Sequence, residues 1–175
     1  MKSKGIIALF FRYILLILIA IPHNLIYAIL TPITIFPVLG ILSLFYPGIA
    51  LQGTSMLINN NVIGIIPACI AGSAYYLLLI LNLSTPMPIK IRIKSLAFML
   101  VSLLVLNILR LVIFIALFVS GFSYFDITHK LSWYFGSTLL VLLIWFANVY
   151  LFKIKGIPAY TDIMSFVKEI RGKKK

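Results

Sequence analysis

The sequence holds four long apolar stretches, at residues 13–30, 69–83, 95–121 and 131–152. A helix crosses the hydrocarbon core of a bilayer with about 20 mainly apolar residues, so stretches of this kind predict transmembrane helices. Of the 175 residues, 63% are hydrophobic and 10% are charged, whereas soluble domains are about 45–50% apolar and about 25% charged. These proportions exclude a soluble globular domain. We expect one integral membrane domain over residues 1–175, with its core at 12–152 and a basic tail at 153–175.

Basic residues separate the apolar stretches. Most of the Lys and Arg fall into three clusters, at residues 2–12, 90–94 and 153–175. Loops rich in Lys and Arg stay in the cytoplasm, and four crossings put all three clusters on that side. We therefore predict a multi-pass protein of the cell membrane with both termini in the cytoplasm. The net charge of +12 is then explained by basic residues that keep the loops and termini in the cytoplasm, and we expect no nucleic-acid partner.

The segment at residues 31–46 is also apolar but holds Pro32, Pro37 and Gly40. A full crossing here would break the charge rule, so we predict a re-entrant or interfacial segment on the outer side. Residues 47–67 carry Gly and Asn clusters that indicate turns, and we expect a small outer-face hairpin. The predicted fold is an all-α polytopic helical bundle with four transmembrane helices and these two additions.

Arg110 lies deep in the apolar stretch 95–121. A charged side chain at membrane depth costs about 2.5–3.5 kcal/mol on insertion scales, so it faces the bundle interior or a water-filled cavity. Asn107 is three residues earlier, on the same helical face, where it is placed to orient the guanidinium. The alternative is a structural arginine that ties helices together or reaches toward lipid phosphates.

Cys69 is the only cysteine, so no internal disulfide is available. Pro67 precedes it by two residues, which predicts that the thiol lies in the first turn of a helix at the outer membrane surface. A helix amino terminus favours the nucleophilic thiolate. Ser73 is expected beside it, one turn later. The alternative is that Cys69 serves only as a small buried apolar residue.

His129 falls in the short predicted outer loop at residues 122–130. Imidazoles titrate near neutral pH, which suits general acid–base work. Asp126, three residues earlier, would accept a hydrogen bond from His129 if this stretch formed one helical turn. The alternative is an ordinary solvated loop histidine.

The three candidates are predicted to lie at one membrane level. A thiolate can attack a carbonyl, an imidazole can move the protons, and a guanidinium can stabilise the oxyanion, which together suffice for acyl transfer. The spacing of the single Cys, two His and three acidic residues matches no metal-ligand pattern, and neither a Walker-type nor a dinucleotide-binding motif is present. We therefore expect no metal and no cofactor.

The order of these residues resembles the exosortase/archaeosortase family of membrane cysteine transpeptidases. Three segments carry the resemblance: Pro-Ala-Cys-Ile-Ala-Gly-Ser at residues 67–73, Asn-Ile-Leu-Arg at 107–110, and Phe-Asp-Ile-Thr-His at 125–129. It covers roughly residues 12–150. One departure is that many bacterial members carry Cys-Ser-Gly or Cys-Asn-Gly at the nucleophile, where this chain has Cys-Ile-Ala-Gly.

The resemblance implies a membrane-embedded cysteine protease or transpeptidase. Its partners would be exported proteins that end in a short motif, a membrane helix and a basic tail, together with a membrane lipid or similar acceptor. By the same resemblance, Cys69 would be the nucleophile, Arg110 the oxyanion stabiliser and His129 the acid/base, all on the outer face.

Two other functions remain open at this point. A protease with the same three residues would only hydrolyse the substrate and release a free carboxylate. A non-enzymatic small membrane subunit, or a permease that binds a lipid headgroup through Arg110, would not need the thiol.

Overall fold

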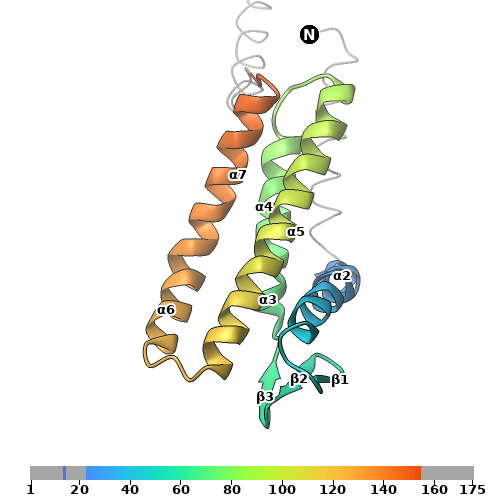
Figure 1. Ribbon diagram of the computed structural model, residues 1–175. Coiled ribbons are helices and arrows are strands. Elements are labelled where there is room, and N and C mark those ends of the chain that lie inside the picture. Colours follow the sequence, from blue (N-terminus) through green and yellow to red (C-terminus); the bar gives the residue numbers. More distant parts are fainter. Residues whose placement is uncertain (1–13, 15–22, 155–175) are drawn as a thin grey trace, which may run out of the picture.

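A computed structural model describes residue 14 and residues 23–154 of the chain (Figure 1). The elements, in chain order, are α2 (His23–Ser43), β1 (Ala50–Gln52), β2 (Ser55–Ile58), β3 (Asn61–Gly64), α3 (Pro67–Ile70), α4 (Gly72–Leu83), α5 (Ile89–Val119), α6 (Phe125–Leu131), the π-helix η1 (Ser132–Gly136) and α7 (Ser137–Leu151). The expected helix at residues 13–30 is therefore described only at Ile14 and from His23 onward. The amino-terminal basic cluster and residues 155–175 lie outside the described part.

Helices α4, α5 and α7 run side by side and form a bundle (Figure 1). Among the described residues, three segments are long and apolar enough to cross a membrane: Ile26–Ser43 of α2, Ile89–Val119 of α5, and the continuous run Phe125–Leu151. The predicted helical membrane architecture is confirmed to this extent. The predicted crossing at residues 69–83 is a shorter helix, α4, of 12 residues.

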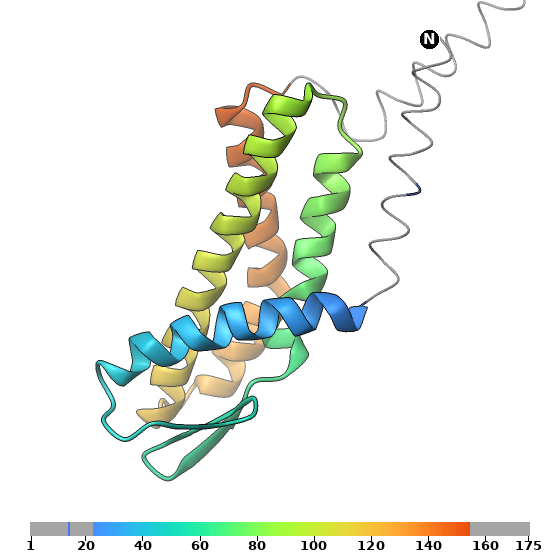
Figure 2. The same cartoon turned by 90° about the vertical axis from the view of Figure 1, so that its right-hand side faces the viewer.

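Helix α2 is continuous through residues 30 and 31, where we predicted the boundary between two segments. That boundary is wrong. Pro32 and Pro37 lie inside the helix; in apolar helices packed against neighbours, the backbone groups that proline frees find other partners, so proline does not have to end the helix. Figure 2 shows α2 lying across α4 and α5 rather than along them.

The predicted small hairpin is a three-stranded antiparallel sheet in the order β1-β2-β3. The turn between β2 and β3 uses Asn59 and Asn60, both in the left-handed region with φ of 47° and 64°. Asparagine tolerates this conformation, and tight hairpins require it at both central positions. Gly53, with φ of 63°, makes the turn between β1 and β2. The Gly and Asn clusters thus mark the two turns. The two turns connect three strands, which is one more than a single hairpin contains.

The sheet packs against α2. Met56 and Ile58 of β2 are buried together with Ile35, Val38 and Leu42 of α2. Their burial positions the sheet, and with it the segment that follows β3 and leads to Cys69.

The connection between α4 and α5 is fixed by polar contacts. Arg92 of α5 donates hydrogen bonds to the carbonyl oxygens of Asn82 (2.7 Å), at the end of α4, and of Thr85 (2.9 Å), just beyond it. Asn82 also donates to Ser95 Oγ at 2.7 Å in the buried interface. These bonds join the two helices near one end of the bundle.

Helix α5 begins at Ile89, directly after Pro88, and so includes Lys90, Arg92 and Lys94 in its first turns. We predicted its start at residue 95 because the apolar run begins there. The predicted start is six residues too late, because the first turns of α5 carry basic residues and hydropathy does not mark them as part of an apolar helix. This end lies beside the end of α7, since Pro88 and Ile91 line a pocket with Lys153.

The opposite end of the bundle holds the sheet and α6, with α3 on the same side (Figure 1). Cys69 and His129, which belong to α3 and α6, are thus separated from the basic residues at the start of α5. The predicted loop at residues 122–130 is helical from Phe125, because α6, η1 and α7 follow one another without a break.

Candidate functional site

One face of α5 organises the site. Asn107, Arg110 and Phe114 are spaced at i, i+3 and i+7, so they lie on one side of the helix. Each contacts a different neighbouring element: Asn107 contacts α3, Arg110 contacts the start of α7, and Phe114 contacts α6. A single face of α5 therefore connects α3 and α6, which carry Cys69 and His129, with the start of α7.

Cys69 lies in α3, a helix of only one turn. Ile66 before it is extended, and Ala71 after it is left-handed, with φ of 60° and ψ of 31°. A left-handed alanine costs about 1–2 kcal/mol, and its geometry separates α3 from α4. We predicted one helix starting near Cys69; the thiol instead belongs to a separate turn between the sheet and α4. Its residue is half-buried.

Asn107 fixes the backbone of that turn. Its side chain, 1% exposed, donates a hydrogen bond from Nδ2 to the carbonyl oxygen of Cys69 at 2.9 Å. We predicted that Asn107 orients Arg110. Its recorded contact is with Cys69 instead, so it is the residue that attaches the thiol-bearing turn to α5.

The Arg110 guanidinium is within electrostatic range of Cys69, where its charge would stabilise a thiolate. Its Nη1 donates to Ser137 Oγ at 2.7 Å. Among the described residues this is the only hydrogen bond recorded for its side chain, so the other N–H groups of the fork are available to a carbonyl oxygen or an anion. No acidic partner within the described part neutralises the guanidinium.

Ser137 was missed by sequence reasoning. It is the first residue of α7 and directly follows the π-helix η1. A π-turn adds a residue to the helical repeat and changes which side chains face the neighbour, and such turns are frequent at functional sites. A serine in an apolar stretch that also holds Ser132 gave only a weak signal, and its partner across 27 positions was not foreseeable.

His129 lies on α6 and not in a loop. Its ring stacks on Phe125, with centroids 5.4 Å apart, and meets Phe114 edge-on at 5.3 Å. The side chain is exposed. The aromatic contacts hold the imidazole one turn along α5 from Arg110, since Phe114 follows Arg110 by four residues.

The other two expected partners are not joined to the site. Asp126 is exposed, and between it and His129 the structure records no hydrogen bond even though the stretch is helical. Ser73 is exposed on α4 and makes no recorded side-chain hydrogen bond. His129 in turn has no recorded hydrogen bond to Cys69 or Arg110. The structure therefore joins Cys69 to Asn107, which is one turn from Arg110, and His129 contacts the same face of α5 through Phe114.

Within residue 14 and residues 23–154, no group of three or more His, Cys, Asp or Glu side chains is arranged to hold a metal ion. The chemistry available here is that of a thiol, a guanidinium and an imidazole. Comparisons with known protein families, with curated proteins and with solved structures find no match to this chain.

Proposed function

We propose that the protein is a membrane-embedded cysteine protease or transpeptidase of the exosortase/archaeosortase type. The observation that supports this best is the hydrogen bond from Asn107 to Cys69, which joins the thiol-bearing turn to the helix that carries Arg110. A nucleophile and a cation near each other in a half-buried setting are what acyl transfer requires.

In the proposed reaction, the Cys69 thiolate attacks the carbonyl carbon of a peptide bond near the carboxy end of an exported protein. Arg110 hydrogen-bonds the oxyanion of the tetrahedral intermediate through N–H groups that Ser137 does not occupy. His129 holds the proton that the Cys69 thiol has lost. When the C–N bond breaks, His129 gives this proton to the leaving amine, and a thioester remains on Cys69. An acceptor, such as a hydroxyl or amine of a membrane lipid, attacks the thioester and restores the thiol; with water as acceptor, the product is a free carboxylate.

The proposed substrate ends in a short motif, a membrane helix and a basic tail. The arrangement of the bundle supports this class. Lys90 and Lys94 are at one end and Cys69 is toward the other, so a helix lying beside the bundle with its basic tail in the cytoplasm would present the motif on the outer face. We propose that the site opens to the exterior and that both termini are cytoplasmic.

The experiment that tests the function is co-expression with a co-encoded exported protein that carries such a tail. We expect wild type to remove the tail, and Cys69→Ala to remove none while accumulating in the membrane at the wild-type level. Unchanged processing by Cys69→Ala would contradict the proposal and favour the permease or structural subunit. Mass spectrometry of the new carboxy end separates transfer to a lipid from hydrolysis.

The proposed orientation has its own test. Because Cys69 is the only cysteine, a membrane-impermeant maleimide reports on that one residue without background. We expect labelling of intact cells and loss of processing in proportion to labelling. Labelling only after the cells are opened would contradict the outward orientation.

A further inference from the structure

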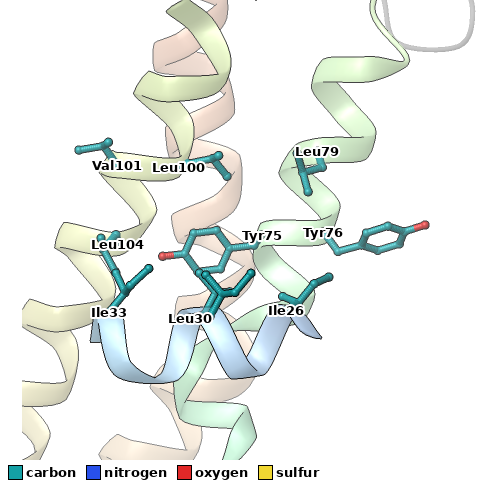
Figure 3. Close-up of a pocket in the computed structure, with 10 residues that line it drawn as sticks. Ile26, Leu30, Ile33, Tyr75, Tyr76, Leu79, Leu100, Val101 and Leu104 are labelled. Atoms are coloured by element: carbon teal, nitrogen blue, oxygen red, sulfur yellow. The ribbon is translucent and has the colours of Figure 1, made fainter. Parts of the chain in front are cut away.

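A pocket of about 420 Å³ lies between α2, α4 and α5, and neither Cys69 nor Arg110 lines it. Its walls include Leu30 and Ile33 of α2, Leu79 of α4, and Leu104 of α5 (Figure 3). This volume falls within the range of about 300–1,000 Å³ typical of small-molecule sites. The pocket is therefore large enough for a ligand and separate from the proposed catalytic residues.

The pocket opens sideways along the helices. Three lining residues are well exposed: Ile29 at 53%, Ile33 at 44% and Val101 at 58%. Val101 belongs to α5, which is long and apolar enough to cross a membrane. Exposed apolar residues on such a helix face hydrocarbon, so a ligand would enter from the bilayer.

Two of the lining residues are tyrosines, Tyr75 and Tyr76. Tyr75 is 5% exposed, and its hydroxyl is buried without a hydrogen-bond partner among the described residues. Figure 3 shows Tyr75 pointing from α4 toward Leu104 on α5, whereas Tyr76 points the other way. Buried hydroxyls are almost always hydrogen-bonded, and an exception calls for an explanation. A ligand that carries an acceptor oxygen provides one.

We propose that this pocket binds one hydrocarbon chain of a membrane lipid, whose ester or ether oxygen accepts a hydrogen bond from Tyr75. A transmembrane helix does not fit inside the site, because a cylinder about 10 Å across and about 30 Å long encloses on the order of 2,000 Å³, several times the pocket volume of about 420 Å³. A single chain fits the volume, the apolar walls and the lateral opening. The inference goes beyond the proposed function and does not depend on chemistry at Cys69.

Photo-crosslinking tests the site. The purified protein in phosphatidylglycerol nanodiscs is irradiated with a trace of phosphatidylglycerol that carries a diazirine on one acyl chain, and labelled peptides are mapped. We expect labelling of pocket residues on α2, α4 and α5. Val101→Trp, at the pocket mouth, should lower it at least fivefold, whereas Val105→Trp should leave it within twofold. Val105 is a matched control, because it is 56% exposed on the same helix and does not line the pocket.

Tyr75→Phe tests the hydroxyl while keeping the ring. We expect the ester lipid to label the variant at least threefold less, and a diazirine-bearing hexadecane, which has no oxygen, to label both proteins equally. The proposal is overturned if Val101→Trp labels like wild type, if Tyr75→Phe binds the ester lipid unchanged, or if the pocket crosslinks to a second copy of the chain. Because Cys69→Ala should label like wild type, failure of this site and failure of the proposed catalysis are distinguishable.

Discussion

Asn107 Nδ2 lies 2.9 Å from the carbonyl oxygen of Cys69 and donates a hydrogen bond to it across 38 positions of sequence. The bond joins a one-turn helix to the middle of α5, at a position three residues before Arg110. The placement of the thiol relative to the guanidinium therefore depends on a buried amide, and Asn107 acts by positioning Cys69 rather than by contacting substrate.

Asn107→Leu keeps the side-chain size and removes this bond. The Cys69 carbonyl loses its partner, so we expect the free energy of unfolding in detergent to fall by about 1–2 kcal/mol. Processing should fall tenfold or more, because the thiol is no longer held beside Arg110. Thermal unfolding and a processing assay measure the two effects. Leu109→Ala, at a position 52% exposed on the same helix, is the control; equal loss of activity in both would contradict the positioning role.

Substitutions at Arg110 and Ser137 should both lower turnover, with the larger loss at Arg110. Arg110→Lys keeps the charge but loses the planar fork, so we expect turnover to fall by about 10²–10³, as when an oxyanion donor is removed. Ser137→Ala removes the 2.7 Å contact that orients the fork and should cost about tenfold, mainly in kcat. Ser120→Ala removes a hydroxyl bonded only to its own helix and should change nothing. Near-normal turnover of Arg110→Lys would remove Arg110 from the oxyanion role.

His129→Phe separates catalysis from packing. A phenyl ring can keep the contacts with Phe114 and Phe125, so we expect thermal stability to stay within about 1 kcal/mol of wild type. Processing should fall by about 10²–10⁴, the usual contribution of a general acid–base. Asp126→Asn should keep activity within twofold, since no hydrogen bond joins Asp126 to His129. Full activity of His129→Phe would assign the imidazole a structural role only.

Gly72→Ala should disturb the packing of α2 on α4. A Cβ at this position would lie 2.8 Å from Tyr27 Cζ and 2.9 Å from its hydroxyl oxygen. Forcing this ring to move costs about 1–3 kcal/mol. The gain from replacing glycine is smaller than the roughly 1 kcal/mol of a helix interior, because Gly72 is the first residue of α4. Unfolding measurements should show a net loss that Tyr27→Leu relieves.

Gly40→Ala is the matched control for this change. Nothing lies within 4 Å of a Cβ at Gly40, so the substitution should be neutral or slightly stabilising. Equal destabilisation by the two alanines would mean that the Tyr27 contact is not the cause.

The helical bundle was predictable because apolar runs of membrane length have few alternatives. The boundaries of the helices were harder to predict. Hydropathy missed the start of α5, where Lys90 and Lys94 are helical, and the prolines of α2 misled because membrane helices tolerate them. The sequence also gave no sign that Ala71 would adopt a left-handed conformation and separate α3 from α4.

The candidate residues could be selected from the sequence, and their role in a site stays a prediction; the contacts that each of them makes could not be foreseen. Cys69, Arg110 and His129 stood out as rare polar groups among apolar ones. Their partners depend on tertiary packing: Asn107 contacts Cys69 and not Arg110, Ser137 is aligned by a π-turn, and His129 is held by two phenylalanines and not by Asp126. Contacts between side chains on different helices depend on how the helices pack, and the spacing of residues along one helix does not determine that packing.

The most direct measurement is the intact mass of the protein during turnover of a processed substrate. We predict an adduct on Cys69 equal in mass to the amino-terminal part of the substrate, which ends at the new carboxyl group, less one water. Neutral hydroxylamine should release it, as it does thioesters, and Cys69→Ala should lack it. An active enzyme that shows no adduct on Cys69, under conditions that remove the acceptor, would contradict the account.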